Sequence, residues 1–331
     1  MRILYILQEY PLVSQTYIKT ELERVARHHE VRIVAFDKAH VPYRRHLPFE
    51  VLDKTVKTTP LARVVGDFAP DRIHAHYIVF APFVARVAQA LGIPFTIRSH
   101  SFDVLDIADG YRARPNAIAA LNHPLCQGVL CFPFALPVLR AAGVSAARLV
   151  PCWPVVDVKR FLDRGANGDR VMNIGACLPK KGMELYVELA QRLPEVGFDL
   201  YALGYRVEEM KRLNQSVASP VRIVDPVEPE LMPAEYKQHR WLVYTASPQH
   251  SSVGWPMAVA EAQASGVGVL MQNVRPDLAD YVGPGFLFDD IEEAHRLVRG
   301  PLPEERREAG FAHAMRSDVD GHIGLLYDLW R

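Results

Sequence analysis

Short apolar runs of strand length alternate with segments of helical periodicity along almost the whole chain. The first run, residues 2–7, is followed by a helical pattern over 16–28 and a second strand-like run over 31–36. The alternation restarts in the second half with a strand at 171–175 and a helix at 183–193. Strands that alternate with helices predict parallel sheets covered by helices on both faces, and hence an α/β fold.

The remaining elements follow the same rhythm. Further strands are predicted around residue 73 and at 94–98, 128–132, 149–150, 198–203, 221–224, 241–244 and 286–288. Further helices are predicted at 61–68, 79–91, 135–142, 207–213 and 232–239, and in a tail that runs to 331.

The pattern breaks once, near the middle of the chain. Pro151-Cys152-Trp153-Pro154 interrupts the alternation, and a polar, glycine-containing stretch follows at 163–169. A length of 331 residues suits two domains, so the connection between them is predicted here. Two Rossmann-like halves would place the carboxyl ends of their strands around one ligand-binding cleft.

The stretch from 251 to 270, SSVGWPMAVAEAQASGVGVL, carries the clearest helix signals. Gly254-Trp255-Pro256 precedes a short helical run that contains Glu261, and Gly266 ends it. A helix start attracts phosphate through its backbone N–H groups and dipole, and a carboxylate one turn in can accept hydrogen bonds from sugar hydroxyls. An ordinary buried helix with a solvated glutamate is the alternative.

Composition narrows the function classes. The chain is 49% hydrophobic and 23% charged, which is typical of soluble globular proteins, and its net charge of zero argues against a dedicated nucleic-acid binder. Residues 1–160 hold 20 Lys and Arg against 13 Asp and Glu, whereas the rest hold 18 against 25. The basic half could steer an anionic acceptor or meet an anionic membrane surface, or it could simply be solvated. The basic residues in question are Lys38, Arg44, Arg45, Lys54 and Lys57.

Nothing in the sequence predicts a membrane span or a disulfide framework. No run of about 18 apolar residues occurs, and the apolar start is stopped by Gln8 and Glu9, so it is interpreted as a strand and not as a signal peptide. The cysteines lack CxxC spacing and are expected to be reduced, buried thiols of a cytoplasmic protein. They are Cys126, Cys131, Cys152 and Cys177.

His74 and His76 alternate on a predicted strand and would share one face. Because no acidic or cysteine partner is visible nearby, a metal site is not expected, and strand-end histidines that line the cleft are. Asp103 and Asp106 could bind an acceptor or cap a helix, and the sequence does not separate these roles.

Several short motifs, in this order and spacing, carry a resemblance to a known family. In the first half they are Ser14 to Ile18, Ile73 to His76, Ser99 to Asp103, and Val156-Asp157 through Phe161. In the second half they are Gly175 through Lys181-Gly182, Val224 through Glu228, and Gly254 through Glu261-Ala262 with Gly266. The chain thereby resembles, over nearly its whole length, the retaining glycosyltransferases of family 4, which have the GT-B architecture.

The resemblance implies two Rossmann-like domains that face each other across a cleft. Residues 1–155 would form an acceptor-side domain, 156–312 a nucleotide-sugar-binding domain, and 313–331 a helix that packs back towards the first domain. The implied reaction is transfer of a hexose-type sugar from a UDP- or GDP-sugar to a sugar or lipid-linked acceptor, with retention and without a metal or other cofactor. The implied setting is cell-surface polysaccharide or glycoconjugate biosynthesis in the cytoplasm, with peripheral contact at the inner membrane face.

The resemblance also assigns roles to residues. Lys181, beside Lys180, matches the lysine that contacts the diphosphate, Glu261 matches the carboxylate that takes the ribose hydroxyls, and His100 matches a histidine beside the transferring sugar. The other implied donor-binding positions are Gly175, Gly204, Pro226, Val227, Gly254, Trp255, Pro256, Met257, Ser14, Gln15 and Thr16.

Two positions depart from the family pattern. Val253 stands where the family usually has a second carboxylate that holds the donor sugar, and Ala176 stands where arginine is common. Valine accepts no hydrogen bond, so sugar recognition must differ or be lost. Lys180 could restore a charge, and Gln249, His250, Ser251 or Ser252 could replace the sugar contacts.

The resemblance suggests front-face departure of the nucleotide diphosphate through an oxocarbenium-like state, in which the protein contributes positioning and phosphate stabilisation. A hydrolase is disfavoured because no pair of carboxylates suited to flank a glycosidic bond is evident. Three classes stay open: an active glycosyltransferase, a nucleotide-sugar-binding protein without transfer activity, and a nucleotide-sugar epimerase. The epimerase is disfavoured because no acid and base pair for proton abstraction is evident.

Overall fold

The computed structural model describes residues 1–52, 65–108, 115–204, 206–249 and 253–331. The predicted helix at 61–68 lies partly outside these residues, as do Lys54, Lys57, His250, Ser251 and Ser252, and the side chain of Asp106 is not described. The described residues form two compact units, Met1–Val155 with Val319–Arg331, and Val156–Asp318. We call them unit 1 and unit 2.

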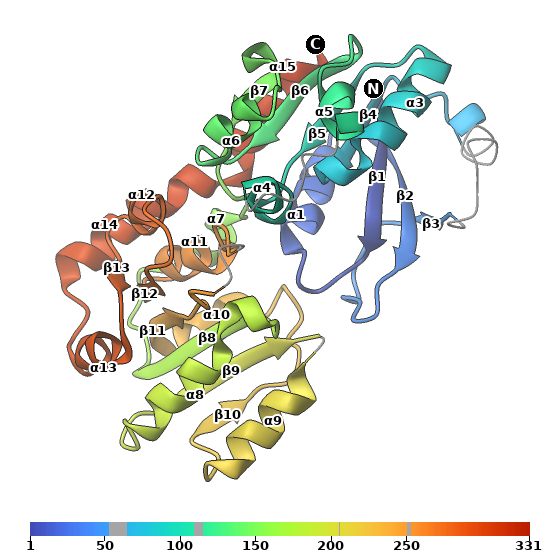
Figure 1. Cartoon of the computed structure of the whole chain (residues 1–331). Helices are drawn as coiled ribbons and strands as arrows, with labels where there is room; N and C mark the ends of the chain where they lie inside the picture. Colours follow the sequence, from blue (N-terminus) through green and yellow to red (C-terminus); the bar gives the residue numbers. More distant parts are fainter. Residues whose placement is uncertain (53–64, 109–114, 205, 250–252) are drawn as a thin grey trace. The chain divides into compact units, whose positions relative to one another are not determined.

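Unit 1 contains a parallel sheet of seven strands in the order β3-β2-β1-β4-β5-β6-β7 (Figure 1). The strands are β1 (Arg2–Tyr10), β2 (Glu30–Lys38), β3 (Glu50–Val51), β4 (Arg72–His76), β5 (Phe95–Arg98), β6 (Cys126–Cys131) and β7 (Leu149–Pro151). The helices are α1 (Thr16–Val25), α3 (Ala81–Leu91), α4 (Ser101–Ala108), α5 (Pro115–Leu121), α6 (Ala135–Ala141) and α15 (Val319–Trp330), with short 3-10 turns η1 (Ile78–Phe80) and η2 (Ala146–Arg148).

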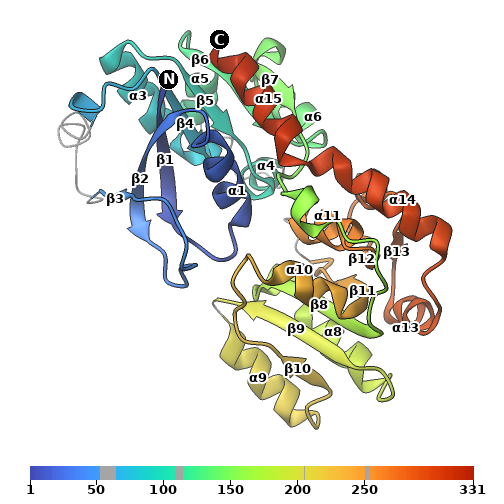
Figure 2. The same cartoon turned by 180° about the vertical axis from the view of Figure 1, so that it is seen from behind.

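Side-chain alternation divides the core of unit 1 into two layers. Leu4 and Ile6 of β1 face a cluster that includes helices α3, α5 and α6, whereas Ile3, Tyr5 and Leu7 face α1 and α15. Figure 2 shows α1 and α15 on the same side of this sheet. The C-terminal helix α15 therefore completes the core of the unit that the first strand begins.

Unit 2 contains a parallel sheet of six strands in the order β10-β9-β8-β11-β12-β13. The strands are β8 (Arg170–Ala176), β9 (Phe198–Leu203), β10 (Val221–Ile223), β11 (His239–Tyr244), β12 (Gly268–Gln272) and β13 (Phe286–Phe288). The helices are α7 (Val158–Phe161), α8 (Met183–Gln191), α9 (Val207–Ser216), α10 (Met232–Lys237), α11 (Met257–Ala264), α12 (Leu278–Val282), α13 (Ile291–Arg299) and α14 (Glu304–Ala314), with 3-10 turns η3 (Pro179–Lys181) and η4 (Met315–Ser317).

The predicted α/β class and the two parallel sheets are confirmed. The units are divided at 155/156 and at 318/319, whereas the predicted divisions are at 155/156 and 312/313. The chain remains in unit 2 after 312 because α14 continues to Ala314 and a 3-10 turn follows it. The polar stretch 163–169 lies within unit 2, and Pro151 ends β7.

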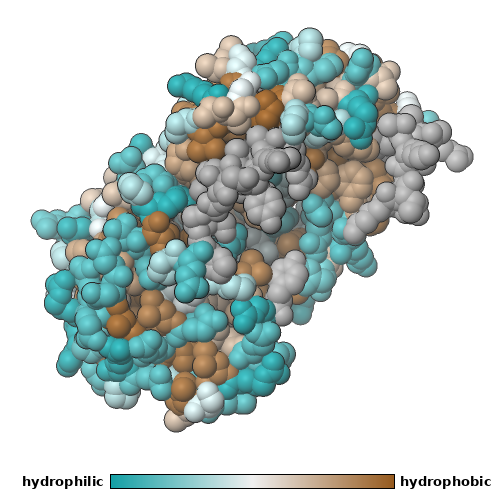
Figure 3. Space-filling view, in the orientation of Figure 1, coloured by the Kyte–Doolittle hydropathy of each residue, from teal (hydrophilic) through white to brown (hydrophobic). Residues whose placement is uncertain are grey.

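The surface and the cysteines agree with a globular chain. Hydrophilic residues separate the hydrophobic areas over much of the face shown in Figure 3. Within the described residues, no helix is both long enough and apolar enough to cross a bilayer. All four cysteines are buried and unpaired with one another, as predicted.

Candidate functional site

The strand order of unit 2 contains one switch point. The connections before it add strands on one side of β8, and the connections after it add strands on the other side. β9 and β10 lie on one side of β8, whereas β11, β12 and β13 lie on the other. Open parallel sheets bind ligands beyond the carboxyl ends of the strands at such a switch point, here between β8 and β11.

Lys181 lies at this switch point. It belongs to the turn η3 that follows β8, and a Cβ atom at position 175 would lie 3.9 Å from its Cε. Its Nζ lies 4.4 Å from the ring centroid of Tyr244, the last residue of β11. The structure therefore brings Lys181 and Gly175 together.

Hydrogen bonds hold the turn against β8 and β11. The Thr245 hydroxyl donates to the carbonyl of Lys181 (2.8 Å) and accepts from Asn173 Nδ2 (3.0 Å). The backbone N–H of Ser247 donates to the carbonyl of Lys180 (3.0 Å). Because both lysines are fixed by backbone bonds, their side chains start from defined positions.

No acidic side chain of the described residues pairs with the ammonium of Lys181. Burial, with a smaller contribution from Lys180, lowers the pKa of Lys181 to about 7, and burial also lowers the pKa of Lys180. Within the described part of the chain, Lys181 forms no salt bridge. An anionic ligand would restore the charged form, so this position suits a phosphate.

The segment before α11 is held by stacking and hydrogen bonds. The Trp255 ring stacks on Tyr281 with centroids 4.7 Å apart, and its Nε1 donates to Asp277 Oδ2 (2.8 Å). The Tyr281 hydroxyl donates to the carbonyl of Pro256 (2.5 Å). Pro256 precedes the helix and has no side-chain acceptor with which to cap it, and Met257 is its first residue. The predicted helix start is confirmed, as is its end near Gly266, which has φ 72°.

Glu261 lies half-buried on α11. Burial raises the pKa of its carboxyl, although the hydrogen bond from the Tyr236 hydroxyl to Oε2 (2.7 Å) opposes this shift. Tyr236 on α10 thus orients the carboxylate, and the second oxygen of the carboxylate can take a ligand hydroxyl.

The positions expected near the nucleotide base share the carboxyl edge of the same sheet. Gly204 follows β9 with φ 75°, and Pro226 and Val227 follow β10, the neighbour of β9. A pocket of about 210 Å³ opens near this edge, lined by Cys177, Leu178, Met183, Glu184, Arg206, Glu209, Met210 and Leu213.

The two departures from the family pattern have different surroundings. The Val253 side chain is 1% exposed, and its carbonyl accepts from Arg275. Gly254 follows it and is half-buried. Ala176 ends β8 and is partly exposed. The buried valine is therefore a packing residue.

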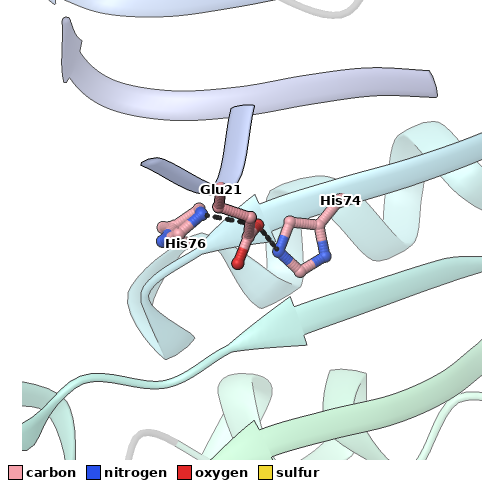
Figure 4. Close-up of side chains that lie close together, drawn as sticks. All are labelled: Glu21, His74 and His76. Atoms are coloured by element: carbon pink, nitrogen blue, oxygen red, sulfur yellow. Dashed lines mark hydrogen bonds and ion pairs between the residues drawn. The ribbon is translucent and has the colours of Figure 1, made fainter. Parts of the chain in front are cut away.

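In unit 1, the polar residues of two strands enter the layer between the sheet and α1. Ile73 and Ala75 of β4 face the opposite layer, so His74 and His76 point towards α1, where Glu21 lies between their rings (Figure 4). Glu21 Oε1 lies 3.1 Å from His74 Nε2 and 3.3 Å from His76 Nε2. All three side chains are 0% exposed.

Two predictions made for His74 and His76 are wrong: that they line the cleft, and that they have no acidic partner nearby. His74 and His76 are buried and do not line a cleft, and they do have an acidic partner, Glu21. Together, the three residues could hold a metal ion, since their ligand atoms all lie within 4.8 Å of one another. The partner was missed because Glu21 is more than 50 positions away in sequence, although its spacing from Ile18 and Val25 places it on the apolar face of α1.

His100 follows β5 and contacts this cluster. Its Nε2 lies 3.0 Å from His76 Nδ1, and its ring centroid lies 4.4 Å from that of Tyr77 and 4.7 Å from that of Tyr17. Burial, with contributions from His76 and Arg98, holds the pKa of His100 well below its usual value. Asp103 accepts from the His100 backbone N–H (2.9 Å) and so lies at the start of α4 as a cap-like residue.

The segment Ser14-Gln15-Thr16 precedes and begins α1, and its side chains are partly exposed. Gln15 Nε2 donates to the Tyr77 hydroxyl (3.0 Å), which also bonds the Tyr17 hydroxyl (2.7 Å). Since Tyr77 packs on His100, the structure brings Gln15 and His100 into one neighbourhood.

No protein-family model matches the chain, and no curated protein matches it. Solved structures with similar folds do exist. Anabaena HepE, crystallised with UDP-glucose, superposes with a TM-score of 0.75 at 16% identity over 97% of this chain and 96% of that one. Sucrose-phosphate synthase from Thermosynechococcus elongatus superposes with a TM-score of 0.70 at 18% identity, over 99% of this chain and 98% of that one.

WaaG, a glycosyltransferase involved in lipopolysaccharide biosynthesis, gives a TM-score of 0.64 at 14% identity over 96% of this chain and 95% of that one. These likenesses extend over both units. The predicted GT-B fold of two Rossmann-like domains is therefore confirmed.

Proposed function

We propose that the chain is a glycosyltransferase that moves a sugar from a nucleotide diphosphate sugar to an acceptor. The observation that carries this proposal is the unbalanced ammonium of Lys181 beside Gly175 at the switch point of the second sheet. The pKa of Lys181 is about 7, so a bound diphosphate would favour the charged ammonium. The ammonium would in turn donate charge-assisted hydrogen bonds to the diphosphate.

The surroundings of Lys181 suit the other parts of such a donor. We assign the ribose hydroxyls to Glu261, which Tyr236 orients, and the phosphates to the segment Trp255-Pro256-Met257 at the start of α11. The base would lie against Gly204 and the loop Pro226-Val227, at the edge where β9 and β10 end. Several similar structures support a UDP-sugar, since HepE was crystallised with UDP-glucose, with UDP, and with UDP and glucose.

The finer assignments rest on the resemblance and on local chemistry. We propose retention of configuration, with His100 and Ser14-Gln15-Thr16 of unit 1 at the sugar and diphosphate. We also propose transfer without a resident metal, because Lys181 supplies the cation that the leaving diphosphate needs. Two proteins of similar structure, WaaG and the lipopolysaccharide outer core galactosyltransferase WaaB, are named for roles in lipopolysaccharide synthesis. This favours a cell-surface glycan as the acceptor. It also favours a cytoplasmic enzyme that binds the membrane peripherally. The exposed basic residues Lys38, Arg44 and Arg45 would suit an anionic surface.

One observation favours a second candidate, a nucleotide-sugar-binding protein without transfer activity. Val253 is buried in the position of the family's sugar-holding carboxylate, and Ala176 replaces an arginine. Such a protein would bind the nucleotide through Lys181 and Glu261 but would not orient the sugar for attack.

A donor panel separates the candidates. The purified chain is incubated with UDP- and GDP-sugars and with lipid-linked or free sugar acceptors, and released nucleotide diphosphate and glycosylated product are measured. Acceptor-dependent release of diphosphate is the expected result. Tight binding of a nucleotide sugar without turnover for any pair would favour the second candidate, and formation of an isomeric nucleotide sugar would establish an epimerase.

A further inference from the structure

A continuous chain of contacts links a buried carboxylate to His100. Glu21 Oε1, from α1, lies 3.3 Å from His76 Nε2, and His76 Nδ1 lies 3.0 Å from His100 Nε2. The His76 and His100 rings are nearly parallel, with centroids 5.2 Å apart and an interplanar angle of 16°. Both Glu21 and His76 are 0% exposed, so water does not compete for these contacts.

The ionisation of Glu21 sets the direction of the hydrogen bonds. Burial alone would raise the pKa of its carboxyl, but Arg98, His74 and His76 hold it well below its usual value. Arg98 Nε donates to Oε2 (2.7 Å), and the Tyr5 hydroxyl donates to Oε1 (3.2 Å). An ionised carboxylate only accepts hydrogen bonds, so His76 Nε2 must carry the proton that it shares with Glu21.

The same reasoning continues through His76. Burial lowers the pKa of His76 to about 4, so the ring is neutral at pH 7. A neutral imidazole with its proton on Nε2 has a lone pair on Nδ1. The contact from that lone pair to His100 Nε2 therefore requires a proton on His100 Nε2.

We propose that Glu21 and His76 are positioning residues that hold His100 as its neutral Nε2–H tautomer and leave His100 Nδ1 as a hydrogen-bond acceptor for a sugar hydroxyl. The role at a sugar rests on the proposed function, whereas the tautomer follows from the contacts of unit 1. The rings of Tyr17 and Tyr77 pack against His100 and restrict its rotation. A neutral acceptor in a fixed orientation can select one hydroxyl direction without placing a positive charge beside an electron-deficient sugar.

A metal ion held by Glu21, His74 and His76 is the competing interpretation of the same cluster. Arg98 already balances the single charge of Glu21, so a divalent cation would add two uncompensated charges to a buried site. A metal on the Nε2 atoms would also force the proton of His76 onto Nδ1, where it would point at His100 Nε2 and reverse the tautomer. The two interpretations therefore predict opposite protonation of the same ring.

The decisive experiment reads histidine tautomers by nitrogen NMR in the full-length, 15N-histidine-labelled chain near pH 7. We expect protonated Nε2 and unprotonated Nδ1 for both His76 and His100. A proton on Nδ1 of His100 would overturn the proposal, as would a chelator-removable metal at one equivalent per chain together with Nδ1 protonation of His76.

Two substitutions at one position separate the link to His100 from simple packing. In His76→Asn the amide oxygen can take the place of Nδ1 and still accept from His100, whereas His76→Gln reaches towards Glu21 and leaves His100 without a partner. We expect the Asn variant to keep the His100 tautomer and the Gln variant to show a mixture. His74→Asn is the matched control, because His74 also lies beside Glu21 and His76, but among the described residues it forms no hydrogen bond with His100.

Kinetics then test the role at the sugar. For an active donor, His76→Gln is expected to lower kcat roughly 10- to 100-fold with little change in donor KM, and His76→Asn to recover most of the loss. An unchanged His100 tautomer in folded His76→Gln, or an equal loss of kcat in both His76 variants, would overturn the proposal. If the wild-type chain turns over no donor, the proposed function fails, but the NMR spectrum still tests the tautomer of His100. If a variant does not fold, the spectrum of the wild-type chain alone tests the tautomer.

Discussion

Lys181 lies half-buried at the carboxyl edge of the second sheet and forms no salt bridge within the described residues. Its carbonyl accepts a hydrogen bond from Thr245, so the side chain leaves a turn that is bonded to the residue after β11. Burying an ammonium without an acidic partner costs free energy, and a bound anion would offset that cost. An unpaired cation of this kind is expected of a phosphate-binding residue and not of a structural one.

Lys181→Ala is expected to weaken UDP or UDP-sugar binding about 10- to 100-fold, because a charge-assisted hydrogen bond contributes roughly 1.5–3 kcal/mol. Isothermal titration calorimetry measures the change. Lys211→Ala is the control, since Lys211 is partly exposed and its salt bridge within the described residues is to Glu208 on the same helix. Equal affinity of the Lys181 variant and the wild type would remove this residue from the donor site.

The buried histidines predict how stability depends on pH. Burial lowers the pKa of His74, His76 and His100 below the usual 6.5, to about 4 for His76. Between about pH 4 and 6.5 the unfolded chain therefore binds more protons than the folded chain, and the free energy of unfolding falls as the solution is acidified. For His76 alone the loss between pH 7 and 4 is on the order of 3 kcal/mol.

Glu21 adds a second loss at lower pH. Its folded-state pKa lies below its usual 4.5, so its contribution is present above that value and disappears as the pH falls through the lowered pKa. Urea unfolding at pH 7, 5.5 and 4.5 checks the histidine effect, and a further measurement below pH 4 checks the Glu21 effect. His76→Asn should reduce the slope between pH 4 and 6.5 by about one proton. A free energy of unfolding that does not change over this range would contradict the neutral, buried state of these rings.

At the scale of elements, the turn between β8 and α8 positions Lys181. Gly182 has φ 53°, and a Cβ atom there would lie 3.2 Å from backbone atoms of Ala246 and Ser247. A side chain at this position is therefore both strained and pressed against the end of β11.

Gly182→Ala is expected to cost about 1–2 kcal/mol of stability and to weaken nucleotide binding, because the turn must shift away from β11. Gly92→Ala is the matched control: Gly92 has φ 69° at the end of α3 but no atom within 4 Å of an added Cβ. Chemical unfolding and calorimetry of both variants separate strain from displacement. Unchanged nucleotide affinity in Gly182→Ala would show that the turn does not set the position of Lys181.

The elements that sequence alone predicted are those with strong apolar runs. Strands β1 and β11 contain continuous apolar runs that are buried on both faces, and the helix from Met257 is bounded by Pro256 and Gly266. β3 was missed because it has only two residues, Glu50 and Val51, and α4 and α5 because no apolar period stands out near 101–121.

The candidate site was predicted unevenly for the same reason. Lys181 and Gly175 are close in sequence, so one motif contains both. Glu21, His76 and His100 come from α1, β4 and the end of β5, and only the sheet brings them together. A glutamate on the apolar face of a helix and paired polar residues in apolar strands, such as Thr96 and Arg98, were the available signals.

At the scale of the whole molecule, unit 1 is built from two separate parts of the chain. α15 contributes Val319, Ile323, Leu326 and Trp330 to the layer that covers β1. The Trp330 Nε1 donates to the Thr96 hydroxyl (3.1 Å), and Arg72 donates to the Trp330 carbonyl. Unit 2 is continuous from Val156 to Asp318.

Trp330→Ala is expected to destabilise unit 1 by about 3–5 kcal/mol, because it removes a fully buried aromatic side chain. Nucleotide binding, which we assign to unit 2, should change little while the protein is folded. Thermal unfolding with and without UDP tests this: the variant should show an earlier transition that UDP does not shift. A UDP affinity that falls in parallel with stability would contradict the assignment of the nucleotide to unit 2.

The return of α15 to the first sheet also determines the order in which the units can mature during translation. Residues 156–318 emerge from the ribosome as a complete set of strands and helices, whereas the earlier-synthesised β1 must wait for α15 to cover it. Until then, the apolar side of β1 and α1 stays uncovered, and a chaperone that binds nascent hydrophobic segments has its natural target there.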